Sequence, residues 1–203
     1  IGTFFHEHLS HHSVYSLNLF FKKHGMRLID IKKVNIQKGS IIGFACHDKS
    51  KIKSTNKPLK YIENEKRIKL NSVNKLNSIN LYLQACSNKI KKIIHNRKII
   101  AYGCARSGPT LAFNMSLKDK FNKIIDNHDL KIGKYTPLNS SKIITSKDID
   151  QFKDHLVVIL AYLHNKKIID KHKKFIRNGG EFLILYPKPK VINNKNLISF
   201  EKN

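Results

Sequence analysis

The 203-residue sequence has no tryptophan and only three cysteines, Cys46, Cys86 and Cys104. Their odd number and wide spacing give no disulfide framework and indicate a reducing compartment. Without a C-x-x-C pair, we expect no structural zinc site. No apolar run approaches the roughly 18 residues that a membrane helix needs, and the first residues lack the pattern of a secretory signal. We therefore expect a cytoplasmic protein without a membrane partner.

Acidic residues are also scarce. The chain has 14 aspartates and glutamates against 39 lysines and arginines, which gives a formal net charge of +25. One interpretation is nucleic-acid binding, since basic surfaces neutralise phosphates. The other is compositional, because only five of the 39 are arginine, the residue best suited to reading phosphates, and the lysines are spread along the whole chain. We favour the second interpretation, and expect the positive field to attract an anionic substrate.

The first half of the chain predicts a helix, two strands and a further helical region. Ser13 can cap a helix that Gly25 ends, and strands are expected at 26–31 and 41–45. Residues 48–60 are Lys-rich and polar, which predicts a linker, and the apolar spacing from about 63 to 96 is helical.

Strands and helices alternate in the second half. Strands are expected at 98–102, 121–126, 155–162 and 181–186, with a helix from Pro109, a short helix that Ser146 caps, and a helix ending at 179–180. This order predicts an α/β fold with a Rossmann-like, doubly wound, mostly parallel sheet. We expect three regions: a partial α/β segment at 1–50, a linker and helix at 51–97, and the Rossmann-like domain at 98–203.

Histidines and one carboxylate gather near the N-terminus, at His6, Glu7, His8, His11 and His12. Histidine is the side chain most easily poised for proton transfer near neutral pH. The cluster could supply a general base with an orienting carboxylate, a metal site, or buried structural histidines, and the spacing alone does not choose among them.

A glycine-containing turn, Gly103-Cys104-Ala105-Arg106-Ser107-Gly108, stands between a predicted strand and a predicted helix. Backbone N–H groups at such a turn can hold a phosphate. Asp126 ends the next strand, at about the distance where dinucleotide folds place a ribose-binding carboxylate. The turn lacks the full G-x-G-x-x-G pattern, so a short loop that needs glycine for its geometry explains it equally well.

Polar residues follow two further strands. Tyr162 ends the apolar strand at 155–162 and His164 follows it, and Lys131, Lys134 and Tyr135 form a basic loop. Open α/β sheets bind ligands at the carboxyl ends of their strands, although each of these residues could equally face water.

Taken in order, these motifs resemble those of the C-terminal half of bacterial SAM-dependent sugar C-methyltransferases. The family's Tyr-His-Glu-His-[Phe/Leu]-Ser segment matches residues 5–10, and its Tyr-Gly-Ala-Ala-Ala-Lys-Gly-Asn-Thr-Leu segment matches residues 102–111. Its Asp-x-x-x-x-Lys-x-Gly-Lys-Tyr-x-Pro segment matches residues 126–137, its Leu-Ala-Trp-Asn strand end matches residues 160–163, and its Gly-Gly-x-Phe and Pro-x-Pro elements match residues 179–189. The resemblance covers residues 3–190.

The resemblance implies that His8 removes the proton beside a keto group of a nucleotide-linked deoxysugar, and that Glu7 orients His8 or the sugar. His6 is the third residue expected at the catalytic site. It implies that the turn from Gly103 to Thr110, with Lys131, helps to hold the nucleotide-sugar. Together with the strand-end residues above, the residues expected to bind the substrate are Tyr102, Gly103, Arg106, Ser107, Gly108, Thr110, Asp126, Lys131, Tyr135 and Tyr162. We expect no metal at the site, and the resemblance implies SAM as the methyl donor of the full-length protein.

The chain departs from the family pattern at three places: Phe5 replaces a tyrosine, Ser107 replaces a lysine for which Arg106 can substitute, and the loop after Pro137 lacks the family's Gly-Thr-His stretch. No Gly-rich SAM-binding loop precedes the histidines, so we expect a fragment that binds SAM poorly and is inactive alone. Two alternatives are a standalone nucleotide- or dinucleotide-binding module and a basic nucleic-acid-binding protein. The particular sugar and the oligomeric state are not predicted.

Overall fold

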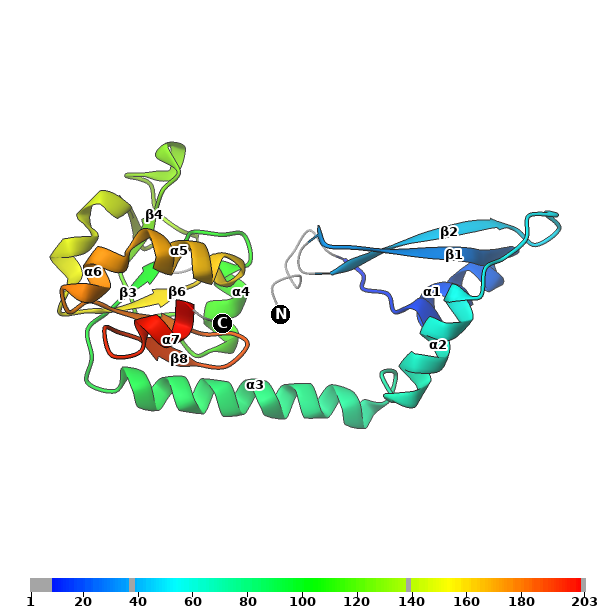
Figure 1. Ribbon diagram of the computed structural model, residues 1–203, viewed down its shortest axis with the longest axis horizontal. Coiled ribbons are helices and arrows are strands. Elements are labelled where there is room, and N and C mark those ends of the chain that lie inside the picture. The colour runs from blue at the N-terminus through cyan, green and yellow to red at the C-terminus, as the bar shows by residue number, and fades with distance from the viewer. Residues whose placement is uncertain (1–8, 37–38, 138–139, 202–203) are drawn as a thin grey trace. The chain divides into compact units, whose positions relative to one another are not determined.

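The computed structural model describes residues 9–36, 39–137 and 140–201 (Figure 1). The described chain forms two compact units, one up to Asn80 and one from Leu81 onward. Each is described by itself.

The first unit contains two short helices and an antiparallel pair of strands: α1 (Val14–Lys23), β1 (Met26–Val34), β2 (Ser40–His47) and α2 (Lys57–Arg67). Ser13 caps α1, as predicted, because its side chain accepts a hydrogen bond from the Ser16 N–H at 3.2 Å. The Ser13 N–H in turn donates to Ser16 Oγ at 2.9 Å, which closes a reciprocal capping box. The helix ends before Gly25, which has φ +65°.

A β-bulge sets the pattern of buried residues in β1. Leu28 and Ile31 are both buried although they are three residues apart, whereas a regular strand alternates every two. The register shifts between Leu28 and Asp30, so the extra residue rephases the strand and returns Ile31 to the inner face. These two side chains pack with Val14 of α1 and Ile62 of α2 to form the small core of this unit.

A buried carboxylate joins the two helices of the first unit. Glu65 of α2 is 8% exposed, and its two oxygens accept the backbone N–H groups of Val14 and Tyr15 at 2.8 Å each. The first N–H groups of a helix have no partner within that helix. Glu65 therefore completes the start of α1 from another element, with its charge placed at the positive end of the helix.

Two predictions for the connecting region are corrected. The predicted linker at 48–60 ends early, because Pro58 occupies the first turn of α2. The single helical region predicted for 63–96 is divided into α2 and α3 (Val73–Ile94). The chain turns at Lys69, which has φ +53°, and Ser72 then accepts the Lys75 N–H at 3.2 Å where α3 starts.

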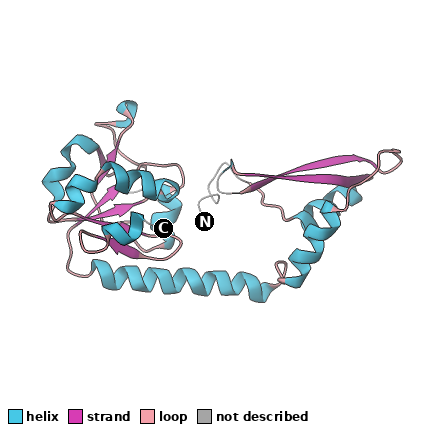
Figure 2. Ribbon diagram, viewed as in Figure 1, coloured by secondary structure: helices cyan, strands magenta, loops and turns pink. Residues whose placement is uncertain are grey.

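The second unit is built on a six-stranded sheet, shown in magenta in Figure 2, with the order β5-β4-β3-β6-β7-β8. The strands are β3 (Ile99–Tyr102), β4 (Lys123–Asp126), β5 (Lys142–Thr145), β6 (Leu156–Ile159), β7 (Glu181–Ile184) and β8 (Lys190–Ile192). All neighbours pair in parallel except β7 and β8, which are antiparallel. This confirms the predicted doubly wound, mostly parallel α/β fold.

Helices cover both faces of this sheet (Figure 1). The C-terminal half of α3 and α4 (Gly108–Asn114) pack on one face, where Ile90 and Leu111 are fully buried. The other face is covered by η3 (Ser146–Phe152), α5 (Asn165–Lys171), α6 (Lys173–Arg177) and α7 (Leu197–Glu201). All four residues of β6 are fully buried, as expected for a central parallel strand.

Several elements of the second unit differ from their predicted form. Strands β5 and β8 and helix α7 were not predicted, so the strand at 181–186 is not the last. The helix predicted to end at 179–180 is divided into α5 and α6 at His172. Thr145 rather than Ser146 caps η3, because its side chain accepts the Lys147 N–H.

Replacing Glu65 tests the junction between the first two helices. We expect Glu65→Ala to lower the free energy of unfolding of the first unit by about 2–4 kcal/mol, because two N–H groups of α1 lose a charged acceptor. Glu63→Ala, at an exposed position on the same helix, should change the free energy of unfolding by less than about 0.5 kcal/mol. Urea unfolding followed by circular dichroism, with amide hydrogen exchange in α1, measures both variants. Equal stability of the two variants would contradict this role for Glu65.

Candidate functional site

The strand order of the second unit places a crevice between β3 and β6. From β3 the chain continues to β4 and β5 on one side of the sheet, and from β6 it continues to β7 and β8 on the other. Open α/β sheets bind ligands at the carboxyl ends of the strands where the order reverses in this way. The loop from Gly103 to Ser107 follows β3, and Leu160 and Ala161 follow β6. The two loops meet directly, since the Leu160 N–H donates to Tyr102 O at 2.9 Å.

Gly103 is required at this meeting point for two reasons. Its φ is +94°, a conformation that other residues rarely adopt. A Cβ added to it would also lie 2.4 Å from the Cβ of Ala161. The absent side chain thus lets the backbone after β3 touch the backbone after β6, while the Gly103 N–H donates to Ile125 O at 2.7 Å.

Asp126 and Lys131 hold the next residue of the loop, Cys104, by both of its backbone groups. Asp126 Oδ2 accepts the Cys104 N–H at 2.7 Å, and Lys131 Nζ donates to Cys104 O at 2.8 Å. The other oxygen of Asp126 accepts the His128 N–H at 2.9 Å, and the Lys131 ammonium lies 3.7 Å from the carboxylate. The pair therefore fixes the loop conformation.

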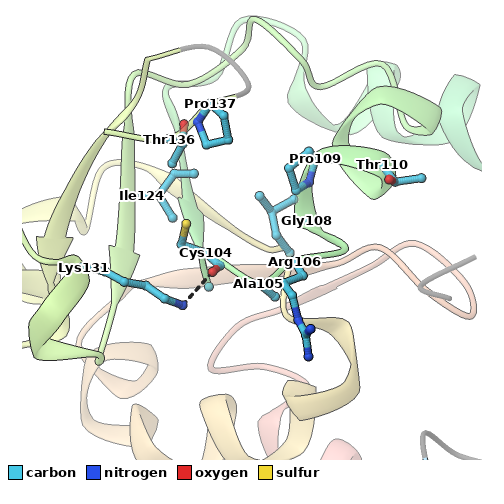
Figure 3. A pocket seen from close by; sticks show the side chains of 12 residues that line it. Cys104, Ala105, Arg106, Gly108, Pro109, Thr110, Ile124, Lys131, Thr136 and Pro137 are labelled. Carbon is cyan, nitrogen blue, oxygen red and sulfur yellow. Dashed lines mark hydrogen bonds between the residues drawn. The ribbon is translucent and has the colours of Figure 1, made fainter. Parts of the chain in front are cut away.

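A cavity of about 620 Å³ lies beside this loop. Figure 3 shows its wall, with Pro109 of α4 and Pro137 of the β4–β5 connection on opposite sides. Its lining is mostly apolar, with a few polar groups, and its size is within the range of small-molecule sites. The lining residues are Gly103, Cys104, Ala105, Arg106, Gly108, Pro109, Thr110, Ile124, Lys131, Thr136, Pro137 and Leu160.

Five of the ten residues predicted to bind substrate line this cavity: Gly103, Arg106, Gly108, Thr110 and Lys131. They come from the loop, the first turn of α4 and the β4–β5 connection, so the fold brings together residues that are distant in sequence.

The other five predicted residues do not line it. Tyr102 and Tyr162 are 2% and 9% exposed and belong to the two cores of the sheet, and Tyr135 is exposed outside the lining. Ser107 precedes α4 as its N-cap, without a side-chain capping bond. The Asp126 carboxylate is already engaged by two backbone N–H groups.

Sequence reasoning missed the four lining residues, other than Lys131, that lie outside the loop and α4, namely Ile124, Thr136, Pro137 and Leu160. Ile124 and Leu160 follow the pattern of ordinary core residues. Ile124 lies within β4 and Leu160 directly follows β6, the two strands that flank β3, and only the tertiary fold brings them to one cavity.

The Tyr102 hydroxyl lies at the centre of a hydrogen-bonded network on the opposite face of the sheet. Asn127 Nδ2 donates to it at 3.0 Å, and it lies 2.9 Å from His172 Nε2. Lys171 Nζ donates to Asn127 Oδ1 at 3.1 Å and to Ser146 Oγ at 3.3 Å. Burial, with a smaller contribution from the Lys171 charge, lowers the pKa of His172 to about 4, so this imidazole is neutral at pH 7.

The chemistry of the cavity is that of binding. Burial raises the pKa of the Cys104 thiol, so this cysteine is not an activated nucleophile. Within the described residues, no group of three metal-ligating side chains could hold a metal ion. The structure also contains, in its described part, no helix with the length and apolarity to cross a bilayer.

The predicted catalytic residues His6, Glu7 and His8 lie outside the described residues. His11 and His12 follow them and are exposed ahead of α1, with the His12 ring 6.2 Å from the ring of Phe20.

The fold and the crevice define a Rossmann-like domain with a cavity at the point where the strand order reverses. Residues 35–187 match the C-methyltransferase C-terminal domain, and the chain belongs to this family. It is 24% identical over 197 residues to the C-methyltransferase NovU of Streptomyces niveus, a match that covers 94% of this chain. The chain spans about half of that relative, 47% of its length.

Substitution of Gly103 tests the contact between the two loops. We expect Gly103→Ala to cost about 2–5 kcal/mol of unfolding free energy, because the strained φ adds to the clash with Ala161. Gly133→Ala is a matched control, because Gly133 also has a positive φ, +81°, but open space around its Cβ position. It should cost only about 1 kcal/mol. Thermal and urea unfolding compare the two, and equal costs would show that the loop contact is unimportant.

The lowered pKa of His172 predicts a loss of stability in acid. The unfolded imidazole takes up its proton near pH 6.5, whereas the folded one resists until about pH 4. The unfolded state therefore binds more protons in this window, and stability is present above pH 6.5 and falls as pH drops toward 4. We expect wild type to lose up to about 2–3 kcal/mol more than His172→Gln between pH 7 and pH 4. Urea unfolding at several pH values measures this, and parallel pH profiles would contradict it.

Proposed function

We propose that this chain is the substrate-binding part of a SAM-dependent C-methyltransferase that acts on a nucleotide-linked keto-deoxysugar. The observation that carries the proposal is the 620 Å³ cavity at the sheet crevice of a C-methyltransferase C-terminal domain. Its apolar walls suit a nucleobase and ribose, and Arg106 and Lys131 on its lining suit an anionic ligand. NovU, the relative that matches over most of this chain, is itself a C-methyltransferase.

In this proposal the nucleotide occupies the cavity and Arg106 binds its phosphates. Lys131 acts mainly through the loop, because its ammonium already donates to Cys104 O and lies near the Asp126 carboxylate. The same engagement of Asp126 favours a sugar nucleotide over a dinucleotide whose ribose needs a free carboxylate.

Catalysis is assigned to the N-terminal motif. His8 takes the proton from the carbon beside the keto group, with Glu7 and His6 assisting, and the enolate carbon that results accepts the methyl group. The donor in the complete protein is SAM, which supplies a methyl group on a positively charged sulfur. The sequence motif alone supports these roles, since the three residues lie outside the described part.

The first unit is further proposed to be the end of a methyltransferase domain. Gly43 faces α1, because a Cβ there would lie 3.2 Å from Leu17, and so Ile42 and Phe44 on either side of it face the other way. Each of these two side chains is 45% exposed. Two strands alone make a marginally stable sheet, which supports a larger sheet in the complete enzyme.

Calorimetry on the 203-residue chain tests the nucleotide site. We expect saturable binding of UDP or dTDP, weaker binding of NAD, and little binding of SAM. Arg106→Gln should raise the Kd for the diphosphate about 10- to 100-fold, the value of a charged hydrogen bond. Arg177→Gln makes the same charge change at an exposed site on α6 and should leave the Kd unchanged. Failure of a folded chain to bind either diphosphate, or equal effects of the two variants, would refute the proposal.

A further inference from the structure

A second, smaller cavity of about 240 Å³ lies at the same edge of the sheet, on the opposite face from the first. It is lined by Tyr102, Asn127, Ala161, His164, Lys167, Ile168 and Lys171. The contact between Gly103 and Ala161 stands between the two, since Gly103 lines the larger cavity and Ala161 the smaller.

The polar lining of this cavity consists of hydrogen-bond donors and cations. Lys167 and Lys171 bring two ammonium groups, and His164 and Asn127 bring an imidazole and an amide. No acidic side chain is among the described residues that line it. Asp170, the carboxylate on the same helix, instead pairs with Lys173 at 3.2 Å.

The position of Lys171 is fixed by neutral groups. Its ammonium donates to Asn127 Oδ1 and Ser146 Oγ, which come from two different connections of the sheet. An ammonium has three donors, so one is left for a ligand. Asn127 is itself anchored on the buried Tyr102 hydroxyl, so the network holds this lysine in place before any ligand arrives.

Lys167 stands one helical turn before Lys171 and lines the same cavity. Like charges at this spacing repel one another, and an anion between them would relieve that repulsion. The cavity is too small for a nucleotide, since sites for drug-sized ligands begin near 300 Å³. These two positive charges, one of them held in place by hydrogen bonds, match the charge of a phosphate dianion, which lysine binds as a point charge.

We propose that this cavity is a second anion site that binds a phosphate group, either as inorganic phosphate or as the end of a small phosphomonoester. The site is separate from the proposed nucleotide site and does not depend on it. Inorganic phosphate and glycerol 3-phosphate are the two probes. Only a site that also contacts the carbons of a phosphomonoester should bind glycerol 3-phosphate more tightly than inorganic phosphate.

The test is calorimetric titration of the 203-residue chain with inorganic phosphate, with ¹⁵N chemical-shift mapping. We expect saturable binding that shifts the amides of Asn127 and His164, and a Kd that rises at least fivefold in Lys167→Gln. Lys166→Gln is the matched control, because this neighbouring exposed lysine does not line the cavity, and its Kd should change less than twofold. Lys171→Gln is a second variant for the same phosphate titration, and circular dichroism checks that it folds.

Three results would overturn the proposal: no saturable phosphate binding by wild type, equal weakening in Lys166→Gln and Lys167→Gln, or shifts confined to Gly108 and Thr110 of the larger cavity. The nucleotide proposal is tested separately. If wild type does not bind UDP, that proposal fails, and the result of the phosphate titration is unaffected.

Discussion

The backbone contact between Gly103 and Ala161 is the constraint on which both cavities depend. The strand order reverses between β3 and β6, so their connections leave toward opposite faces and open a crevice. A side chain at Gly103 would fill that crevice from within, at 2.4 Å from Ala161. Because the backbones touch instead, the crevice is divided into a larger, apolar cavity on the α4 face and a smaller, cationic one on the α5 face.

Three acidic residues of this basic chain are placed at structural junctions. Glu65 completes the start of α1, Asp126 holds the loop after β3, and Glu181 pairs with Arg97 where α3 leads into the sheet. Lysines greatly outnumber these partners, and most of them remain on the surface. Asp126, the acidic residue predicted to meet a ribose, accepts two backbone N–H groups and so acts on the protein's own loop.

The sequence predicted local features better than it predicted contacts between distant residues. The Ser13 cap, the strands beginning near 99 and 156, and the turn before Pro109 follow from capping, apolar patterning and proline preference, which act within a few residues. Strand β8 escaped prediction because it follows two prolines and has only three residues. Tyr102 resembles a ligand-binding residue in its motif, yet burial beside His172 is a tertiary property that no local pattern records.

The two units differ in how completely they bury their own apolar surfaces. The sheet of the second unit is covered on both faces, and β6 is fully buried along its length. The two cavities of this unit therefore lie beside a fully packed core. The pair of strands in the first unit is covered by helices on one face, while Ile42 and Phe44 are exposed on the other. Apolar side chains aligned on one face of a strand are the usual mark of a surface that packs against protein. Both cavities of the second unit therefore lie on a sheet that is covered on both faces, whereas the strand pair of the first unit keeps one apolar face uncovered within the described residues.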